Sequence, residues 1–300
     1  MSPKQRVLVI GEALATFMHY PTDPPLRFEG PILSGAPVIF ASAAARLGVD
    51  VVLGTAVGAD MFGDLFRERL GRDGVSSAGV IVDAERPTSA AFLSYEADGS
   101  RHYVFYLDGT ASLGVGPDVL DRAGAIDWVH VSGATLSFGG TTADTTWLAV
   151  ERAMASGARI SFDPNVRSAG LAPETARRVA RLLEVADVVL ASAGELEAIE
   201  GSEARILARG GAVCYKAGAA GATVLFGDDR WSVPAPTAHE VDPDGAGDIF
   251  AAGYVAATLA GADPRASAVV GVRVASKSVE VRGPLESPIE PVDRYLEGAR

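Results

Sequence analysis

Short apolar runs alternate with amphipathic stretches along most of the chain. The run RVLVI at residues 6–10 contains only one polar position and ends at a glycine, as expected for a strand buried on both faces. Strands that alternate with helices predict an α/β fold with a mainly parallel sheet and helices on both faces. Further strands are expected at 51–57, 128–131, 159–162, 187–190, 212–216 and 223–226, and helices at 36–47, 61–70, 141–156, 173–183, 247–259 and 264–281.

Two segments depart from this alternation. Residues 16–33 contain four prolines and short extended pieces. Residues 88–107 predict two strands, 89–95 and 101–107, around the turn ADG. Such hairpin material forms either a small lid over one end of the core or an ordinary extension of the sheet edge. The length suits two average domains or one large α/β domain, and because no linker or repeat occurs we expect a single domain, 1–300, with lid segments at 16–33 and 88–107.

Composition and charge argue against several classes of protein function. The chain has 300 residues, 48% of them hydrophobic and 21% charged, which is ordinary for a globular protein with a sizeable core. With 26 basic and 38 acidic side chains the net charge is −12, which argues against a nucleic-acid or anionic-membrane surface. No apolar run approaches the roughly 18 residues of a membrane span, and the start of the chain does not resemble a signal peptide. Cys214 is the only cysteine, so no intrachain disulfide forms and a cytoplasmic location is expected.

The segment DPDGAGD at residues 242–248, followed by an apolar helix, is the most informative about chemistry. Its glycines permit a turn that directs backbone N–H groups to one point, and the start of the helix adds positive potential. Such a site suits a phosphate or a phosphoryl group in transfer, beside which Asp248 would accept a proton from an attacking hydroxyl. The alternative is that Asp248 is only a favourable acid at a helix start and that the glycines form a tight turn.

Six segments in a fixed order resemble the ribokinase-like (PfkB) carbohydrate kinase family, most closely its fructokinase and 2-keto-3-deoxygluconate kinase branches. They are GEAL at 11–14, VGADMFG at 57–63, DPNVR at 163–167, SAGE at 192–195, KAGAAG at 216–221 and DPDGAGD at 242–248. The resemblance implies a three-layer α/β/α ribokinase-like fold with a small β lid. It also implies transfer of a phosphoryl group from ATP to a sugar hydroxyl with Mg²⁺, although no P-loop and no protein-kinase glycine motif occurs.

The resemblance also assigns residues to catalysis and to the nucleotide. Asp248 is expected to be the general base, and the backbone of Gly245, Ala246 and Gly247 is expected to hold the transferring group. Glu195 is expected to hold Mg²⁺ through water, or else is only an acid that starts a helix. The nucleotide is assigned to Ser192, Glu195, Gly218, Gly221 and Asp242, although the two glycines also fit a plain turn. Lys216 ends a buried strand, where it could simply extend its amine to solvent, and is left out of the site.

The acceptor is expected to lie near the carboxyl ends of the core strands, where open α/β sheets bind ligands. Arg167 would either reach an anionic ligand group or make a structural ion pair. Tyr106 lies on the expected lid, where alternate side chains face substrate or solvent. The substrate-binding residues expected from the resemblance are Thr16, Ser34, Gly35, Ile39, Tyr106, Asp163, Asn165 and Arg167.

Two positions depart from the pattern of the family. Fructokinase-like relatives open with Gly-Glu-x-Leu-x-Asp, and the position of that aspartate is Thr16 here. The usual Gly-Gly-x-x-x-Asn is SGAPVI, so that Ser34 replaces a glycine and Ile39 replaces the asparagine. A sugar hydroxyl left unpaired against isoleucine would cost about 1–3 kcal/mol. We therefore expect an acceptor that is less hydroxylated or more apolar than fructose or ribose.

The same departures also suit a family member that has lost kinase activity and works as a ligand-binding or regulatory protein. Against that alternative stands the intact GAGD segment. A nicotinamide-dependent oxidoreductase is excluded, because the glycine fingerprint after the first strand is missing. The expected partners are therefore ATP, a small sugar-like molecule and a second copy of the chain bound through the lid.

Overall fold

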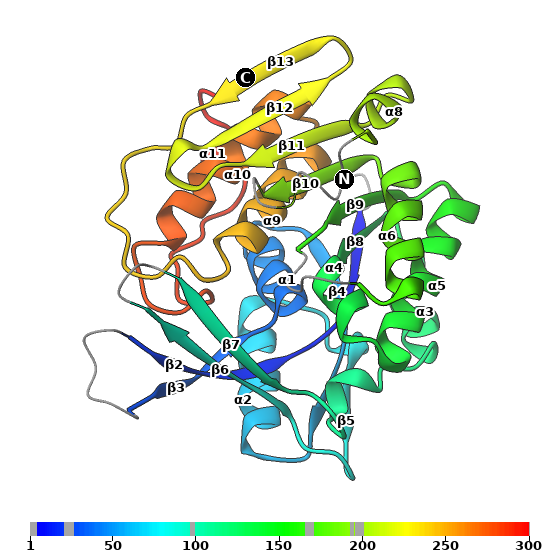
Figure 1. Ribbon diagram of the computed structural model, residues 1–300, viewed down its shortest axis with the longest axis vertical. Coiled ribbons are helices and arrows are strands. Elements are labelled where there is room, and N and C mark those ends of the chain that lie inside the picture. The colour runs from blue at the N-terminus through cyan, green and yellow to red at the C-terminus, as the bar shows by residue number, and fades with distance from the viewer. Residues whose placement is uncertain are drawn as a thin grey trace.

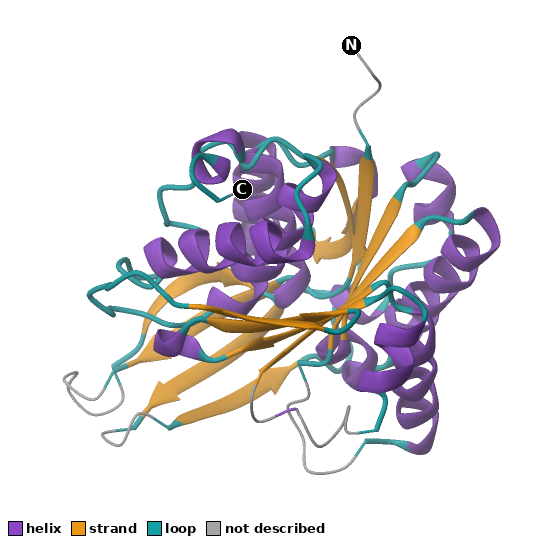
Figure 2. Ribbon diagram, turned by 90° about the horizontal axis from the view of Figure 1, so that it is seen from above, coloured by secondary structure: helices purple, strands orange, loops and turns teal. Residues whose placement is uncertain are grey.

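Nine strands form one sheet in the order β13-β12-β11-β10-β9-β8-β1-β4-β5, and helices cover both of its faces (Figures 1 and 2). The computed structural model describes residues 5–20, 27–96, 100–165, 171–192, 195 and 201–299. From β11 to β5 all neighbouring strands are parallel, whereas β12 and β13 are antiparallel additions at one edge. The predicted α/β fold class is confirmed.

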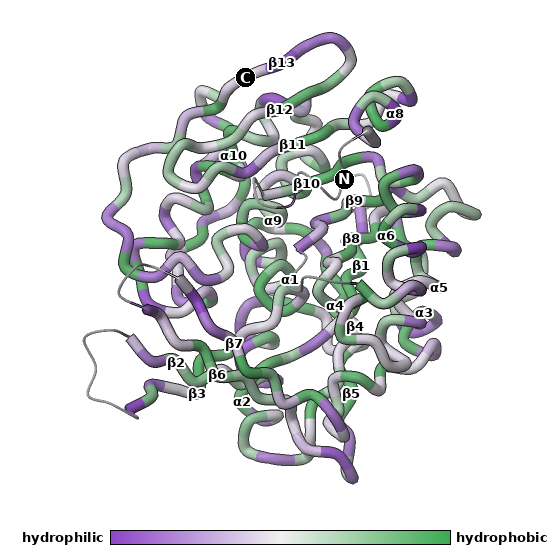
Figure 3. Tube along the Cα trace, in the orientation of Figure 1, coloured by the Kyte–Doolittle hydropathy of each residue, from purple (hydrophilic) through white to green (hydrophobic). Residues whose placement is uncertain are grey.

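Seven strands of this sheet coincide closely with the predicted ones, whereas β5 and β13 were not predicted. The nine strands are β1 (Arg6–Ile10), β4 (Asp50–Gly58), β5 (Val80–Asp83), β8 (Trp128–Ser132), β9 (Arg159–Asp163), β10 (Val188–Ser192), β11 (Ala212–Lys216), β12 (Ala222–Phe226) and β13 (Asp229–Val233). In β1, the four residues after the first are 2% exposed or less, so its apolar sequence fits burial on both faces. The central strands are hydrophobic and β13 is largely hydrophilic, as expected for an edge strand that discourages further pairing (Figure 3).

The helices bury two separate apolar layers, one on each face of the sheet. One layer contains α1 (Ala36–Arg46), α2 (Met61–Asp73), α9 (Ala246–Leu259), α10 (Pro264–Ser278) and α11 (Asp293–Leu296). The other contains α3 (Asp118–Ala123), α4 (Gly133–Phe138), α5 (Gly140–Ser156), α6 (Pro173–Val185) and α8 (Glu203–Ala208). Within the described residues, no helix has both the length and the apolar character needed to cross a membrane.

Helix α9 lies in the middle of its layer, in contact with both α1 and α10. Its sequence is rich in small residues because its neighbours come very close. A Cβ atom on Gly253 would lie 3.0 Å from the Cα atom of Gly271 in α10, closer than ordinary contacts allow. This packing fixes the position of the first turn of α9, which belongs to the GAGD segment.

A second, four-stranded sheet has the order β3-β2-β6-β7 and extends to one side of the main sheet (Figure 1). The two segments singled out as irregular supply all of its strands, although the turn expected at 97–99 lies outside the described residues. The strands are β2 (Leu14–His19), β3 (Glu29–Ser34), β6 (Ser89–Tyr95) and β7 (Arg101–Tyr106). We refer to them as the small sheet.

The VGADMFG segment builds the junction between the main sheet and the small sheet. Asp60 caps α2 by accepting the backbone N–H groups of Phe62 and Gly63 at 3.0 and 2.9 Å. The same carboxylate accepts the backbone N–H and the hydroxyl of Thr88, both at 2.8 Å, just before β6 begins. Burial would raise the pKa of Asp60, but these hydrogen bonds outweigh it and lower that pKa. The segment therefore holds the entry to the small sheet in place.

Candidate active site

The GAGD segment forms the turn at the start of α9. Gly245 is the residue before the helix and has a left-handed φ of 74°. A Cβ atom there would lie 2.6 Å from Pro284 and 2.9 Å from the side chain of Ile39, so only glycine fits. Ala246, Gly247 and Asp248 form the first turn, whose backbone N–H groups have no partner within the helix. The geometry is therefore that of an anion-binding helix start.

A buried ion pair lies across from this turn. The Lys216 ammonium is 2.5 Å from Oδ2 of Asp163, and the side chains are 11% and 2% exposed. Burial alone would lower the pKa of Lys216, but the surrounding carboxylates, led by Asp163, outweigh burial and raise it. The Lys216 nitrogen also lies 3.3 Å from the position that a Cβ on Gly247 would occupy. Lys216, which was left out of the expected site, therefore carries its positive charge beside the turn at the start of α9.

Two carboxylates in this region fit a hydrated Mg²⁺ ion. Oδ1 of Asp163 is buried and has no hydrogen-bond partner within the described residues. Glu195 lines the same part of the cleft and accepts the backbone N–H of Ser192 at 2.7 Å. No group of three or more His, Cys, Asp or Glu side chains in the described part of the chain is arranged to hold a metal. An ion here would therefore take its other ligands from water and from the substrate phosphates, as Mg²⁺ commonly does.

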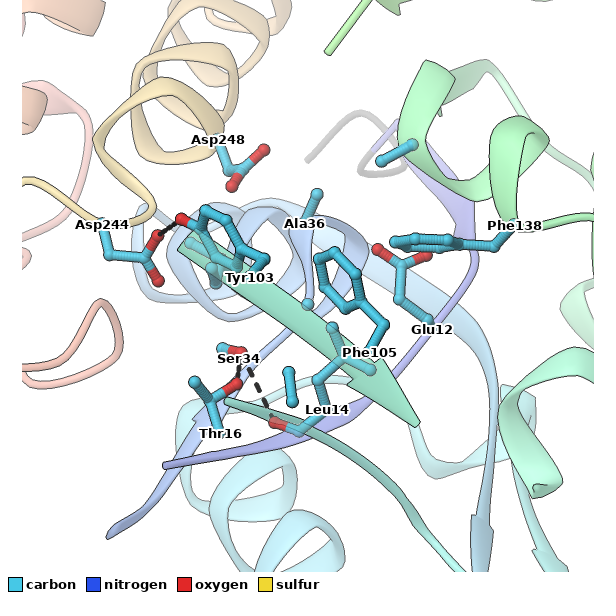
Figure 4. A pocket seen from close by; sticks show the side chains of 14 residues that line it. Glu12, Leu14, Thr16, Ser34, Ala36, Tyr103, Phe105, Phe138, Asp244 and Asp248 are labelled. Carbon is cyan, nitrogen blue, oxygen red and sulfur yellow. Dashed lines mark hydrogen bonds between the residues drawn. The ribbon is translucent and has the colours of Figure 1, made fainter. Parts of the chain in front are cut away.

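The acceptor residues expected in the N-terminal part of the chain come together in one pocket. Its lining includes Thr16, Ser34, Gly35 and Ile39, together with Asp248. The hydroxyls of Thr16 and Ser34 are 2.5 Å apart, so they bond to each other (Figure 4). The pocket has an empty volume of about 430 Å³ counted out to its mouth. We call it the acceptor pocket.

Strand β7 of the small sheet closes one side of the acceptor pocket. The face of β7 that lines the pocket is the opposite of the one that we expected. Tyr103 and Phe105 line the pocket (Figure 4). Tyr106, which was expected to bind substrate, is 60% exposed and packs edge-on against Phe92. Because strand side chains alternate between faces, Tyr106 points away from the pocket when Tyr103 and Phe105 point into it. The expectation for Tyr106 is corrected on this ground.

Asp242 was assigned to the nucleotide, but its contacts are those of a residue that holds the loop. It is 2% exposed, and its oxygens accept the hydroxyl of Tyr95 at 2.7 Å and the backbone N–H of Gly283 at 2.9 Å. The hydroxyl of Tyr20 and the backbone N–H of Asp244 are also bonded to it, at 3.4 and 3.1 Å. Asp242 therefore ties the GAGD segment to the small sheet and does not line the cleft described next.

A larger cleft lies on the other side of the GAGD turn, with an empty volume of about 1370 Å³ out to open solvent. Gly218 and Gly221 line it and have left-handed φ values of 55° and 92°. A Cβ atom on Gly221 would lie 2.0 Å from the carbonyl oxygen of Val233, so that turn requires glycine. The remaining walls come from Ser192, Ala246, Gly247, the loop 235–243 and helix α10. We call this space the nucleotide cleft.

A third space lies beside both of the others, and we call it the connecting space. It shares Tyr103, Asp244 and Asp248 with the acceptor pocket. It shares Arg101, Ser192, Lys216, Pro243 and Gly247 with the nucleotide cleft. Because neighbouring spaces share lining residues, the three lie side by side around the GAGD turn, and we refer to them together as the groove.

The remaining expected residues lie at the carboxyl end of β9. Asp163 and Asn165 both line the connecting space. Asn165 has a left-handed φ of 36°, which is uncommon for a residue other than glycine, and its side-chain amide lies 3.5 Å from the hydroxyl of Ser132. Arg167 lies outside the described residues.

Sequence reasoning missed several side chains that line the groove: Glu12, Arg101, Tyr103, Phe105, Phe138, Lys216 and Asp244. A signal existed for some of them. Lys216 opens the KAGAAG segment, and the alternation along β7 marks Tyr103 and Phe105 as one face without saying which face is buried. Phe138 gave no signal, because an aromatic residue at the end of a short helix is ordinary core material.

Comparisons with known proteins agree on one family. The profile of the pfkB family carbohydrate kinase matches residues 5–290. The chain is 31% identical to a 2-dehydro-3-deoxygluconokinase of Thermoproteus tenax, covering 95% of this chain and 91% of that protein. It is also 31% identical to a fructokinase of Klebsiella pneumoniae, covering 85% of each.

Solved structures give the same result. An E. coli protein provisionally named Ribokinase II, solved in complex with ATP and Mg²⁺, superposes with a TM-score of 0.84 at 31% identity over 98% of each chain. The groove, the buried acid at the helix start and these likenesses lead to one conclusion. The chain belongs to the pfkB family of carbohydrate kinases and is an ATP-dependent sugar kinase that works with Mg²⁺.

Proposed function

We propose that Asp248 is the general base for transfer of the γ-phosphoryl group of ATP to a hydroxyl of a sugar-like acceptor. The observation that carries this proposal is the position of Asp248, which lines both the acceptor pocket and the connecting space. A hydroxyl in the acceptor pocket and a phosphate from the nucleotide cleft would meet beside its carboxylate. Proton transfer by such a positioned group contributes roughly 10²–10⁴-fold to the rate.

The proposed reaction is a single displacement. The acceptor oxygen forms a bond to the γ-phosphorus while its proton passes to the Asp248 carboxylate. The bond between that phosphorus and the bridging oxygen breaks, and its electron pair stays on ADP. The phosphorylated acceptor and ADP then leave, and Asp248 loses its proton to water.

Fixed positive groups would stabilise the charge that the phosphoryl group carries in transfer. The backbone N–H groups at Gly245, Ala246 and Gly247 point from a helix start, where the helix dipole adds to them. The Lys216 ammonium stands beside the same turn. Mg²⁺ held near Asp163 and Glu195 would supply further neutralisation of the phosphate oxygens.

The acceptor pocket supports an alcohol that differs from the common sugars. Thr16 and Ser34 satisfy each other at 2.5 Å, and Ile39 packs against Gly245, so these positions do not offer the carboxylate and amide of fructokinase-like relatives. Phe105 and Phe138 add aromatic walls. We propose that fructose and ribose are poor substrates and that a modified sugar, nucleoside-like or deoxy acceptor is preferred. An efficiency on fructose above about 10⁴ M⁻¹s⁻¹, which is ordinary for an enzyme, would contradict this.

The variant Asp248→Asn tests the assignment of the base. It keeps the size of the side chain but cannot accept the proton, so turnover should fall by roughly 10²–10⁴-fold while ATP binding measured by calorimetry persists. The matched control is Asp64→Asn, which removes another acid from the first turn of a helix, α2, at a site 78% exposed. A loss of less than about tenfold in Asp248→Asn, or an equal loss in the control, would refute the role of general base.

The alternative function is that of a binding or regulatory protein that does not phosphorylate its ligand. It rests on Thr16 and Ile39, which stand in place of the usual aspartate and asparagine. A panel of acceptors separates the two functions. Binding of ATP together with an acceptor, without release of ADP for any member of the panel, would favour the alternative. Release of ADP that depends on the acceptor and on Asp248 would favour the kinase.

We also propose that residues 1–300 act as one domain in which the small sheet serves as a lid, and that two copies pair through its outer face. Phe28, Val104 and Tyr106 are exposed on this sheet, and Phe28 and Tyr106 both pack against Phe92. Exposed apolar side chains gathered in this way are typical of an interface. Sedimentation equilibrium should find a dimer that Val104→Glu weakens, whereas a monomer at all concentrations would contradict the pairing.

A further inference from the structure

The acceptor pocket carries an excess of negative charge. Glu12, Asp244 and Asp248 line it, and each is less than one-tenth exposed (Figure 4). Among the described residues that line this pocket, none is Lys, Arg or His. The cations Arg101 and Lys216 line the connecting space and the nucleotide cleft instead.

Asp244 is the carboxylate that the proposed chemistry does not use. Asp248 takes the proton, and Glu12 accepts the hydroxyl of Thr135 at 2.7 Å. Asp244 is held at the pocket wall by the Tyr103 hydroxyl, which donates to its Oδ1 at 2.9 Å (Figure 4). Arg101 lies 3.8 Å from the same oxygen and offsets part of its charge from the nucleotide side.

The aromatic walls favour the same kind of ligand. Phe105 and Phe138 have ring centroids 5.0 Å apart, and Tyr103 is stacked on Phe105 at 5.5 Å with the ring planes 3° apart. Together the three rings give the pocket an aromatic wall, and the faces of aromatic rings attract cations through their negative potential. An anionic group brought into this space would meet like charges in a poorly hydrated site, where they act strongly.

We infer that the acceptor is an alcohol that is neutral or carries an amino group, with an N–H donor directed at Asp244 and an apolar part against Phe105 and Phe138. Anionic acceptors, such as sugar acids and sugar phosphates, should bind more weakly in this pocket, because its three buried carboxylates would repel them. The inference rests on the proposed kinase function and goes further by fixing the charge of the acceptor. It separates this chain from its relative in Thermoproteus tenax, whose name refers to a sugar acid.

Three six-carbon probes test the inference because they differ in charge: 1-amino-1-deoxyfructose, fructose and 2-dehydro-3-deoxygluconate. Binding is measured by calorimetry with ADP and Mg²⁺ present, and kcat/KM is measured with ATP. We expect the amino sugar to bind best and the sugar acid worst, with at least about a hundredfold between these two. Equal or inverted affinities, or no detectable binding of the amino sugar, would overturn the inference.

The variant Asp244→Asn isolates the charge. Its side-chain oxygen can still accept the Tyr103 hydroxyl, so the pocket keeps its shape while one negative charge is lost. The ratio of the affinity for the amino sugar to the affinity for the sugar acid should fall about tenfold. The control Asp64→Asn should leave this ratio unchanged. A ratio that Asp244→Asn does not change would also overturn the inference. Because the order of binding is measured without turnover, it stands apart from the Asp248→Asn test that decides the proposed function.

Discussion

Replacement of Lys216 by methionine tests the buried ion pair most directly. Methionine keeps an unbranched side chain of similar length, so the change removes the charge without leaving a large cavity. The carboxylate of Asp163 stays behind with a side chain that is only 2% exposed. An unpaired buried charge of this kind typically costs about 3–5 kcal/mol of stability. At about 2 °C per kcal/mol for a chain of this size, the unfolding midpoint should fall by roughly 6–10 °C.

A double variant separates the effect of the stranded charge from that of the lost lysine side chain. Adding Asp163→Asn to Lys216→Met should recover part of the loss, because it removes the stranded charge.

Urea and thermal unfolding in the presence of a chelator measure these quantities. The matched control is Lys277→Met, which breaks an exposed pair with Glu290 at 3.1 Å and should cost no more than about 1 kcal/mol. A loss in Lys216→Met as small as in the control, or no recovery on adding Asp163→Asn, would refute the argument from burial.

Three further predictions concern other parts of the groove and the core. Glu195→Gln should raise the Mg²⁺ concentration that gives the half-maximal rate, because a neutral amide holds the hydrated ion less well, and an unchanged titration would leave Glu195 as a helix-start acid. Thr16→Asp combined with Ile39→Asn should raise kcat/KM for a common ketohexose, and no gain over wild type would count against our interpretation of these positions. Burial lowers the pKa of His130 to about 3, below its unfolded value near 6.5, so its contribution to stability should be lost as the pH falls from 6.5 towards 3, by up to about 1.4 kcal/mol per unit. In urea unfolding over this pH range, the His130→Gln variant should take up about one proton fewer than wild type. The same slope of stability against pH in both proteins would contradict the assignment.

The core of the fold could be predicted because its strands are buried on both faces. A run such as 6–10 shows this directly in sequence, and the glycine that follows marks its end. The edge strand β13 could not be predicted in this way, because its sequence DRWSV mixes charged and apolar residues without a clear period.

In the candidate site, too, some parts could be predicted from the sequence and others could not. The GAGD turn was predictable because all of its parts are adjacent in the chain. The partners of that turn come from distant segments: Lys216 meets Asp163 across 53 positions, and Tyr103 meets Asp244 across 141. Neither pairing leaves a local pattern. The period of β7 gives two faces, and only the packed structure shows that Tyr103 belongs to the inner one.

The tyrosines that join the small sheet to the GAGD loop affect how fast an acceptor can bind. Tyr20 and Tyr95 donate to Asp242, and Tyr103 donates to Asp244, so moving the small sheet away from the GAGD loop requires these bonds to break. Hydrogen bonds to charged groups contribute about 1.5–3 kcal/mol each. A net preference of only about 2 kcal/mol for the joined state would leave the sheet open roughly 3% of the time. The acceptor would then arrive at a rate set by how often the sheet opens, so that its observed association would be about thirtyfold slower than its encounter with the protein surface.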